Sequence, residues 1–469
     1  MTTESKGSRA LLWLVACGFF MQTLDGTIVN TALPGIAKNL QTSPLKMQSV
    51  VVAYLLTMAM IIPASGWISD KFGVRQVFIG ALALFATGSL FCAFSQNLTQ
   101  LVLSRILQGM GGALLLPVGR LALLRSVPHD QFLQAISFVA TPGLLGPLIG
   151  PVLGGWLVEV ASWHWIFLIN IPVGIIGGIA ASIYMKGDPE AESSSFDWTG
   201  YLLLAFGMVS VSLAMDAGYS LGLRRAGILL LMIFGLASIA GYWIHASRNP
   251  KPLFSPKIFS IPTLSIGLLG NLFSRLGSSS MPFLVPLFLQ VNMGYSPFRA
   301  GLMLLPMAAA GIGIKRFAPF LIYKFGYRNV LATNTILIGF SMSSFFWLDS
   351  SDIWWLLSLQ LFCFGAFNSL QFTAMNTFTL KDLEGNFTSS GNTILSMVQM
   401  LAMGMGVACG AAALEGFTDL FGKEPTNMLL SFKSTFVCMG LITLSSSFIF
   451  WQIKKEDGRS AVLKDSVLD

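Results

Sequence analysis

Long apolar runs recur along the whole chain, and they limit its fold more than any other feature of the sequence. Many of them exceed the ~18–20 residues that a helix needs to cross the core of a lipid bilayer. Hydrophobic residues make up 54% of the 469 residues and charged residues 10%, with a mean hydropathy of +0.71. A typical soluble domain has about 25% charged residues. We therefore predict an all-α polytopic membrane protein.

Cutting these runs at charged residues and at clusters of Pro, Gly and Asn predicts fourteen transmembrane helices. The runs at 262–290 and 352–378 are longer than a bilayer core requires, so we expect them to tilt or to continue beyond it. No soluble domain fits between the spans. They lie near residues 11–33, 48–68, 77–95, 100–122, 135–157, 163–185, 197–217, 223–245, 262–290, 297–318, 328–347, 352–378, 388–414 and 430–452.

Lys and Arg are distributed unevenly between the predicted loops. With the N-terminus in the cytoplasm, most of them fall on the cytoplasmic side, and few, such as Lys38 and Arg299, fall outside. Cytoplasmic loops carry the excess of positive charge in membrane proteins, so we predict that both termini are cytoplasmic. This asymmetry also accounts for the net charge of +7, and we expect no nucleic-acid partner.

Residues that support enzymatic or metal chemistry are scarce. The chain has three histidines, no HExxH motif and no GxxxxGK[ST] phosphate loop. Its five cysteines all fall inside predicted spans and form no CxxC pair. We therefore expect no enzymatic activity, no metal site and no cofactor. A secondary transporter, a channel and a membrane-embedded scaffold remain as classes.

One charged phrase occurs twice, as DKFGVRQV at 70–77 and YKFGYRNV at 323–330. Each copy falls in a predicted cytoplasmic loop after the second span of a half, provided that the second half begins with the run at 262–290. This spacing predicts two six-helix halves with two helices inserted between them, and parallel repeats of this kind build many carriers. The predicted parts are an N-terminal bundle (1–185), a linker with two helices (186–257), a C-terminal bundle (258–452) and a cytoplasmic tail (453–469).

Five motifs occur in order, at residues 24–34, 66–75, 101–120, 143–155 and 163–174, and through them the chain resembles the major facilitator superfamily. The resemblance covers essentially the whole chain. Two of them, LDGTIVNTALP (24–34) and WHWIFLINIPVG (163–174), resemble its fourteen-helix drug:proton antiporter family. The chain departs from that family at His164, where an Arg is usual, and in the second loop phrase, where Tyr323 replaces an acid. The other three are GWISDKFGVR (66–75), LVLSRILQGMGGALLLPVGR (101–120) and GLLGPLIGPVLGG (143–155).

The resemblance implies the major facilitator fold, with 14 transmembrane helices arranged as 6+2+6, in the inner (cytoplasmic) membrane of a bacterium. It also implies a proton-coupled antiporter that exports small amphipathic compounds or drugs by alternating access. The expected partners are the lipid bilayer, a small-molecule substrate and protons, and we expect a monomer. The alternative is an exporter or symporter of one defined metabolite, such as a sugar or a siderophore. A channel or a scaffold would need neither a buried acid nor an alternating gate.

Asp25 and Arg105 are predicted to lie at the same depth in the bilayer. Asp25 is ~21 Å from the inner boundary at ~1.5 Å per residue, and Arg105 is ~9 Å below the outer face of a ~30 Å core. Ionisable residues inside spans are energetically costly and commonly functional. Our hypothesis is that Asp25 carries the proton and that Arg105 alternately pairs with it and releases it. The alternatives are a static ion pair and a different partner for Arg105.

The loop motif at 66–75 contains Gly66, Asp70, Gly73 and Arg75. Gly73 permits a tight turn. Asp70 can meet a helix N-terminus or Arg75 across the closed inner gate, which would make the loop a latch. The alternative is a charge cluster that only sets the topology.

The antiporter motif places glycines three to four residues apart, on one helix face, with prolines beside them. Small residues let helices approach closely, and the prolines could kink the span. The face would then seal the outward pathway against proton leak, or it would be an ordinary packing face. The residues are Gly143, Gly146, Pro147, Gly150, Pro151 and Gly154.

Polar residues inside other spans are candidates for lining a substrate cavity. Each is equally compatible with an interhelical hydrogen bond. Arg275 has no evident acidic mate in the second half, and it could attract an anionic substrate group or be satisfied by carbonyls. The candidates are Gln22, Asn30, Gln108, Asn271, Arg275, Gln371, Asn376 and Gln399.

Overall fold

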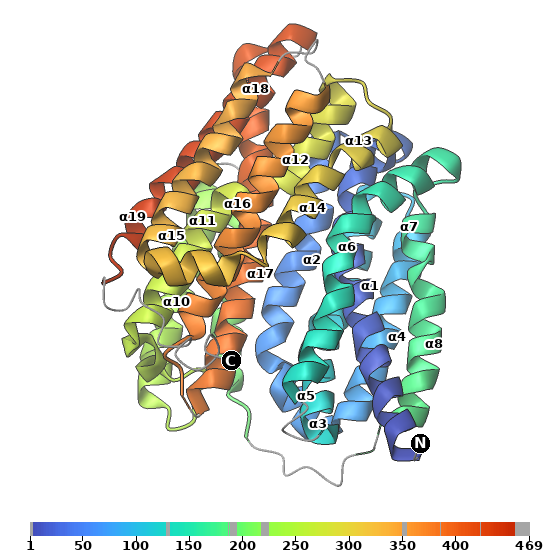
Figure 1. The fold of residues 1–469 in the computed structure, drawn as a ribbon, viewed down its shortest axis with the longest axis vertical. Helices are drawn as coiled ribbons and strands as arrows, with labels where there is room; N and C mark the ends of the chain where they lie inside the picture. Colours follow the sequence, from blue (N-terminus) through green and yellow to red (C-terminus); the bar gives the residue numbers. More distant parts are fainter. Residues whose placement is uncertain are drawn as a thin grey trace. The chain divides into compact units, whose positions relative to one another are not determined.

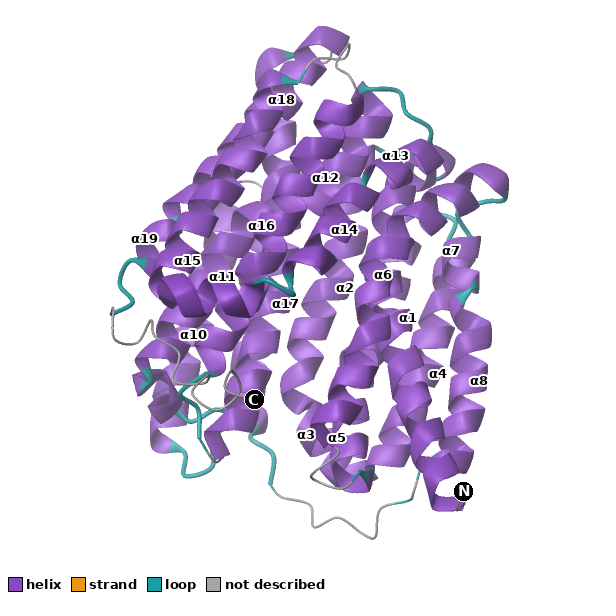
Figure 2. Ribbon diagram, in the orientation of Figure 1, coloured by secondary structure: helices purple, strands orange, loops and turns teal. Residues whose placement is uncertain are grey.

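A computed structural model describes residues 3–127, 132–185, 187, 195–216, 225–348, 354–384, 386–422 and 424–454. These residues form helices joined by short turns, and none of them lies in a β-strand (Figures 1 and 2). The all-α prediction is therefore confirmed. The predicted tail at 453–469 falls almost entirely outside the described residues.

Ten α-helices precede residue 250 in the described part of the chain. Each predicted span in this region corresponds to one helix, or to consecutive helices separated by a short turn. They are α1 (Thr3–Asn39), α2 (Gln48–Ile61), α3 (Ser65–Phe72), α4 (Val74–Ala93), α5 (Leu98–Ser126), α6 (Phe132–Val160), α7 (Trp165–Leu168), α8 (Asn170–Tyr184), α9 (Trp198–Asp216) and α10 (Arg225–Arg248).

The helices that follow show the same correspondence with the predicted spans. A π-helical turn at Phe288–Asn292 ends the long span that begins at Pro262. They are α11 (Pro262–Ser278), α12 (Met281–Leu287), α13 (Pro297–Met303), α14 (Leu305–Ile314), α15 (Ala318–Ser343), α16 (Trp354–Leu380), α17 (Asn386–Phe421), α18 (Pro425–Ser445) and α19 (Ser447–Phe450).

Thirteen helical segments of the described chain are long and apolar enough to cross a membrane. The predicted span at 352–378 corresponds to α16, which has 27 residues but is not among the thirteen. Its sequence carries Gln, Asn and Thr throughout its C-terminal half, and these lower its hydropathy. The total of fourteen spans therefore stays a prediction.

The chain divides into two compact units. The first contains Met1–Leu253 and Val285–Leu302, and the second contains Phe254–Leu284 and Met303–Asp469. In the first unit α1 packs along α6, α4 packs against α5 and α8, and α9 packs against α10 (Figure 1). In the second unit α11 contacts α16, α17 and α18, and α14 and α15 both contact α16. The three-part division predicted from sequence stays a prediction.

The two copies of the charged phrase adopt the same backbone conformation. Gly73 has φ 82° and ψ 140°, and Gly326 has φ 77° and ψ 155°. Only glycine takes up this conformation without steric cost, so the shared glycine has a physical reason in both halves. This agreement supports the interpretation of the phrase as a mark of an internal repeat.

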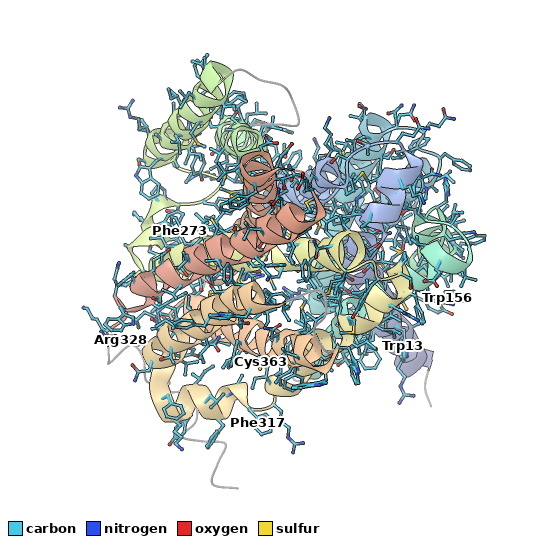
Figure 3. All side chains as sticks on the ribbon, turned by 90° about the horizontal axis from the view of Figure 1, so that it is seen from above. Trp13, Trp156, Phe273, Phe317, Arg328 and Cys363 are labelled. Atoms are coloured by element: carbon cyan, nitrogen blue, oxygen red, sulfur yellow. The ribbon has the colours of Figure 1, made fainter. Side chains whose placement is uncertain are left out.

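Large apolar side chains cover much of the outer surface. Trp13 is 58% exposed and Phe317 is 57% exposed, and both lie at the periphery of the side-chain view, as does Trp156 (Figure 3). Soluble proteins rarely expose contiguous apolar surface on this scale. A surface of this composition is suited to contact with lipid tails.

Asp197 joins the start of α9 to the end of α10 and the segment after it. Its carboxylate accepts hydrogen bonds from the backbone N–H groups of Gly200 (3.0 Å) and Leu253 (3.1 Å), and His245 Nε2 lies 2.8 Å from Oδ1. Burial acts to raise the pKa of Asp197, but these hydrogen bonds and the charge of His245 outweigh it and lower the pKa below its ordinary value. The ionised form of Asp197 therefore stabilises this end of the helix pair.

Replacing Asp197 by Asn is expected to reduce the free energy of unfolding at pH 7 by about 1.5–3 kcal/mol, the usual worth of hydrogen bonds to a charged group. Because the folded pKa is lowered, the contribution is fully present above the unfolded pKa of about 3.9 and is lost as the pH falls through the folded pKa. Thermal unfolding at pH 7 and near pH 3 measures the difference. Asp382→Asn, at a site that is 47% exposed, is the control. An equal effect of Asp197→Asn at both pH values would contradict the assignment.

Candidate functional site

Asp25 and Arg105 form an ion pair inside the first unit. Arg105 Nη1 lies 2.6 Å from Asp25 Oδ2, and the two side chains are 1% and 0% exposed, respectively. Asp25 is carried by α1 and Arg105 by α5. The two side chains, which the sequence predicts to lie at the same depth, are therefore in direct contact. Neither is accessible to solvent.

Three further side chains complete a buried hydrogen-bond network around the Asp25 carboxylate. Gln108 Nε2 donates to Asp25 Oδ1 (2.7 Å), and Asn170 Nδ2 donates to the same oxygen (3.0 Å). Both amides also donate to Ser89 Oγ, over 2.6 Å and 3.1 Å. Because the donors lie on α5 and α8 and the acceptors on α1 and α4, the network ties four helices together at one point.

The guanidinium of Arg105 has partners besides Asp25. Nη1 also donates to Gln108 Oε1 (2.6 Å), and Nε donates to the carbonyl of Val50 (3.4 Å). The Tyr54 ring lies under the guanidinium, with 4.0 Å between Cζ and the ring centroid. These neutral partners, all in α2 and α5, would remain with the cation if the carboxylate became neutral.

The network contains residues that the sequence did not single out. Asn170 lies within the quoted motif at 163–174, so the motif was the one signal that could have found it. Ser89 and Tyr54 are ordinary polar residues in apolar spans, and only the folded arrangement brings them to the pair. Of the predicted cavity residues, Gln108 belongs to the network.

The loop motif makes a different contact from the one expected. Asp70 pairs with Arg125, with 3.0 Å between Oδ1 and Nη2, and the side chains are 47% and 36% exposed. Arg75 donates instead to the backbone carbonyl of Ser182 in α8. Asp70 and Arg75 thus have separate partners in this structure, Arg125 in α5 for Asp70 and Ser182 in α8 for Arg75. The latch that the sequence predicts, with a helix N-terminus or Arg75 as the partner of Asp70, stays a prediction.

Replacing Asp70 by Asn is expected to change the free energy of unfolding by less than about 1 kcal/mol, because exposed ion pairs contribute little. If the pair is a latch, transport should nevertheless fall several-fold. The reversed pair Asp70→Arg with Arg125→Asp should recover part of that rate. Parallel measurements of thermal unfolding and dye export separate the two effects. Unchanged export by Asp70→Asn would contradict the latch and would leave the alternative, in which the charged loop only sets the membrane topology.

The four glycines of the antiporter motif lie against α1. A Cβ at Gly143, Gly146 or Gly150 would overlap Phe19, Thr23 or Thr27, respectively. Thr27 Oγ1 also donates to the carbonyl of Gly146 (3.2 Å). Gly154 meets the backbone of Ile28 in the same way. The predicted smooth face is therefore a line of close contact between α6 and α1.

Pro147 and Pro151 lie inside α6, as the sequence predicted. The backbone of Pro151 is also the close neighbour of Gly301 in α13, and Gly155 approaches the backbone of Pro297. These residues all belong to the first unit. Glycines thus let α6 approach both α1 and α13 closely.

The remaining candidates for a cavity separate into groups. Gln22 and Asn30 lie on α1, and each has a buried side-chain oxygen without a hydrogen-bond partner among the described residues. Gln371 donates to Thr335 Oγ1 (2.7 Å) and accepts from Asn334 (2.9 Å), so it serves an interhelical contact within the second unit. Asn271, Arg275, Asn376 and Gln399 form a separate cluster in the second unit.

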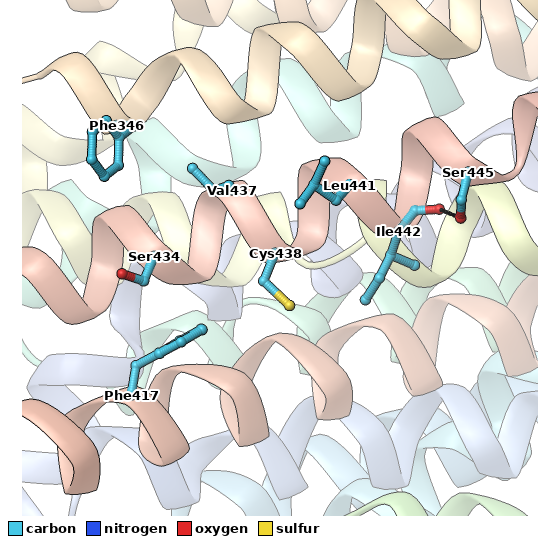
Figure 4. Close-up of a pocket in the computed structure, with 8 residues that line it drawn as sticks. All are labelled: Phe346, Phe417, Ser434, Val437, Cys438, Leu441, Ile442 and Ser445. Carbon is cyan, nitrogen blue, oxygen red and sulfur yellow. Dashed lines mark hydrogen bonds between the residues drawn. The ribbon is translucent and has the colours of Figure 1, made fainter.

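A cavity of about 550 Å³ in the second unit contains none of the predicted site residues. Its lining comes from α17, α18 and the turn before α16, and most of the side chains are apolar (Figure 4). Phe346, Phe417 and Leu441 are among them. The cavity is thus separate from both polar clusters.

The fold agrees with comparisons with known proteins. The chain belongs to the Major Facilitator Superfamily, whose family model matches residues 15–407. It is therefore a multi-pass protein of a transporter family, and its surroundings are the lipid bilayer. The superfamily inferred from the motifs is confirmed.

Individual relatives are similar over nearly the whole chain. "Putative multidrug resistance protein MdtD" of Serratia proteamaculans is 47% identical over 94% of this chain and 93% of its own length. The protein of the same name from Salmonella typhi is 46% identical over 99% and 98%. The crystal structure of a D-xylose-proton symporter superposes with a TM-score of 0.68, at 14% identity, over 96% of this chain and 98% of that chain. This last similarity concerns the fold alone.

Proposed function

We propose that the protein is a proton-coupled antiporter that exports small amphipathic compounds or drugs by alternating access. The observation that carries this proposal is the acid Asp25, 0% exposed and paired to Arg105 inside a membrane-spanning helix. A buried ion pair is costly compared with apolar packing, so its presence in a transporter suggests a use in the transport cycle. The names of the relatives, which refer to multidrug resistance, support the cargo class.

In the proposed cycle Asp25 is the proton carrier. Protonation removes its charge, and Arg105 then keeps its contacts with Gln108, the Val50 carbonyl and the Tyr54 ring. Since Asp25 is sealed from solvent in this structure, proton exchange requires a state in which the helices around it admit water. Hydration and the distance to Arg105 then decide whether the acid holds its proton. A static ion pair would make the same contacts but would not need that opening.

The proposed location is the inner membrane of a bacterium, with both termini in the cytoplasm. The excess of Lys and Arg in the predicted cytoplasmic loops supports this orientation, and the relatives come from bacteria. We take the functional protein to be a monomer. Each of the two compact units has its own buried core, and each polar cluster lies within one unit of a single chain.

An exporter or symporter of one defined metabolite, such as a sugar or a siderophore, is the alternative. The polar cluster at Asn271, Arg275, Asn376 and Gln399 favours it, because a carrier for broad apolar cargo has less use for several hydrogen-bonding groups. The two functions differ in how many unrelated compounds the protein moves.

Dye retention in bacterial cells that lack their own drug exporters tests the proposal. Cells producing the protein should retain less of several unrelated lipophilic cations and neutral dyes than cells with an empty vector, and a proton uncoupler should abolish the difference. Sugars and siderophores are measured in parallel as radiolabelled compounds. Movement of a single metabolite and of no dye would support the alternative and contradict broad export.

A further inference from the structure

Arg275 is a buried cation with very few partners. It lies on α11 within a membrane-spanning segment and is 9% exposed. Its Nε donates to Asn271 Oδ1 (3.3 Å), whereas Nη2 is buried and makes no hydrogen bond within the described residues. No Asp or Glu of the described chain lies within ion-pairing distance of its guanidinium.

Arg275 has fewer hydrogen-bond acceptors than Arg105, the buried arginine of the first unit. Arg105 has a carboxylate, an amide and a carbonyl as acceptors, whereas the described acceptors of Arg275 amount to one amide oxygen. A guanidinium keeps its charge in proteins, so Arg275 cannot become neutral to escape this cost. An unpaired buried charge destabilises a protein, and an anionic group that arrives with the cargo would remove that cost.

The surroundings define the chemistry of the missing group. The Phe372 ring of α16 lies 4.7 Å from Arg275 Cζ and is 38% exposed, so an apolar surface adjoins the guanidinium. Asn376 and Gln399 add neutral amides and are joined by a 2.5 Å hydrogen bond. One guanidinium neutralises one negative charge and matches the two oxygens of a carboxylate, whereas a phosphate monoester brings about −1.5 to −2.

We propose that Arg275 binds a carboxylate of the transported compound, with Phe372 packing against its apolar part. The cargo thus includes organic acids with an apolar or aromatic body. This inference rests on the proposed transport function and narrows its cargo. Export of such an anion is also favoured by a membrane potential that is negative inside.

Matched acid and amide pairs test the site. The full chain is purified in detergent, and its thermal unfolding midpoint is measured with benzoate or benzamide and with 1-naphthoate or 1-naphthamide. In the native protein each acid should raise the midpoint more than its amide, and the naphthoate should act at lower concentration than benzoate. Arg275→Gln should weaken acid binding about tenfold or more, since charge-assisted hydrogen bonds are lost, and should leave the amides unchanged.

Two controls keep the test decisive. Arg275→Lys retains the charge and should retain part of the preference for acids even if Arg275→Gln folds poorly. Arg299→Gln removes an exposed arginine of the first unit and should behave like the native protein. Equal effects of acid and amide on the native protein, or an acid preference that survives in Arg275→Gln, would overturn the proposal.

Proton movement in vesicles separates this inference from the transport function. If the native protein moves protons with neutral dyes but shows no acid preference, the carboxylate site is overturned and the antiporter stands. If the acid preference depends on Arg275 while no compound moves protons, the site is supported and proton coupling is overturned.

Discussion

Arg105→Leu is expected to lower the free energy of unfolding by about 3–5 kcal/mol, the usual cost of removing one partner of a buried ion pair. The substitution leaves the carboxylate of Asp25 with only the amide donors of Gln108 and Asn170. Denaturation of the purified protein by detergent or heat measures the loss. The effect should be among the largest of any single substitution in the first unit.

The double variant Asp25→Asn with Arg105→Leu is the matched control for this prediction. It removes both charges, so it should recover most of the stability lost in Arg105→Leu, because the cost comes from an isolated charge and not from the missing contact. A double variant that is less stable than Arg105→Leu would mean that the pair itself stabilises the bundle. Such a result would favour a static structural role.

Gly146→Ala is expected to disrupt the contact between α6 and α1. The added Cβ would lie 2.7 Å from the backbone nitrogen of Leu24 in α1, and backbone cannot move aside as a flexible side chain can. Overpacking of this kind typically costs about 1–3 kcal/mol. If the face also seals the outward pathway, the variant should leak protons in vesicles without any substrate.

Gly178→Ala is the control for Gly146→Ala. Gly178 lies on α8, and a Cβ there would meet nothing within 4 Å. Alanine is the better helix former by up to about 1 kcal/mol, so this variant should be as stable as the native protein or slightly more so. Equal behaviour of the two variants would contradict the close contact between α6 and α1. Lower stability without proton leak would leave packing as the only role of the face.

Much of the fold could be predicted from the sequence because the bilayer imposes a simple rule on it. Apolar runs of membrane-spanning length predict the helices, and the repeated loop phrase marks two of the described turns that hold a glycine at positive φ, Gly73 and Gly326. The polar span at 352–378 shows where the rule weakens, since a helix surrounded by other helices can carry Gln, Asn and Thr. Hydropathy alone then gives no clear signal for it.

The centre of the candidate site could also be predicted, but its surroundings could not. Asp25 and Arg105 stand out because charge is rare inside spans, and helical rise places them at one depth. Ser89, Tyr54 and the carbonyl of Val50 have no such signal, because their positions depend on how α2, α4 and α5 rotate against each other. The pairing of Asp70 with Arg125 could not be predicted for the same reason: Arg125 is distant in sequence and close only in the folded bundle.

The most direct test of proton coupling through Asp25 is compound-induced proton movement in inverted membrane vesicles. The native protein, Asp25→Asn and Asp382→Asn are compared across lipophilic cations, neutral dyes and aromatic acids. We predict that some compound releases protons through the native protein and Asp382→Asn, and that Asp25→Asn gives no signal although it is inserted in the membrane in equal amount. Equal proton release by Asp25→Asn would place the proton site elsewhere and contradict the account.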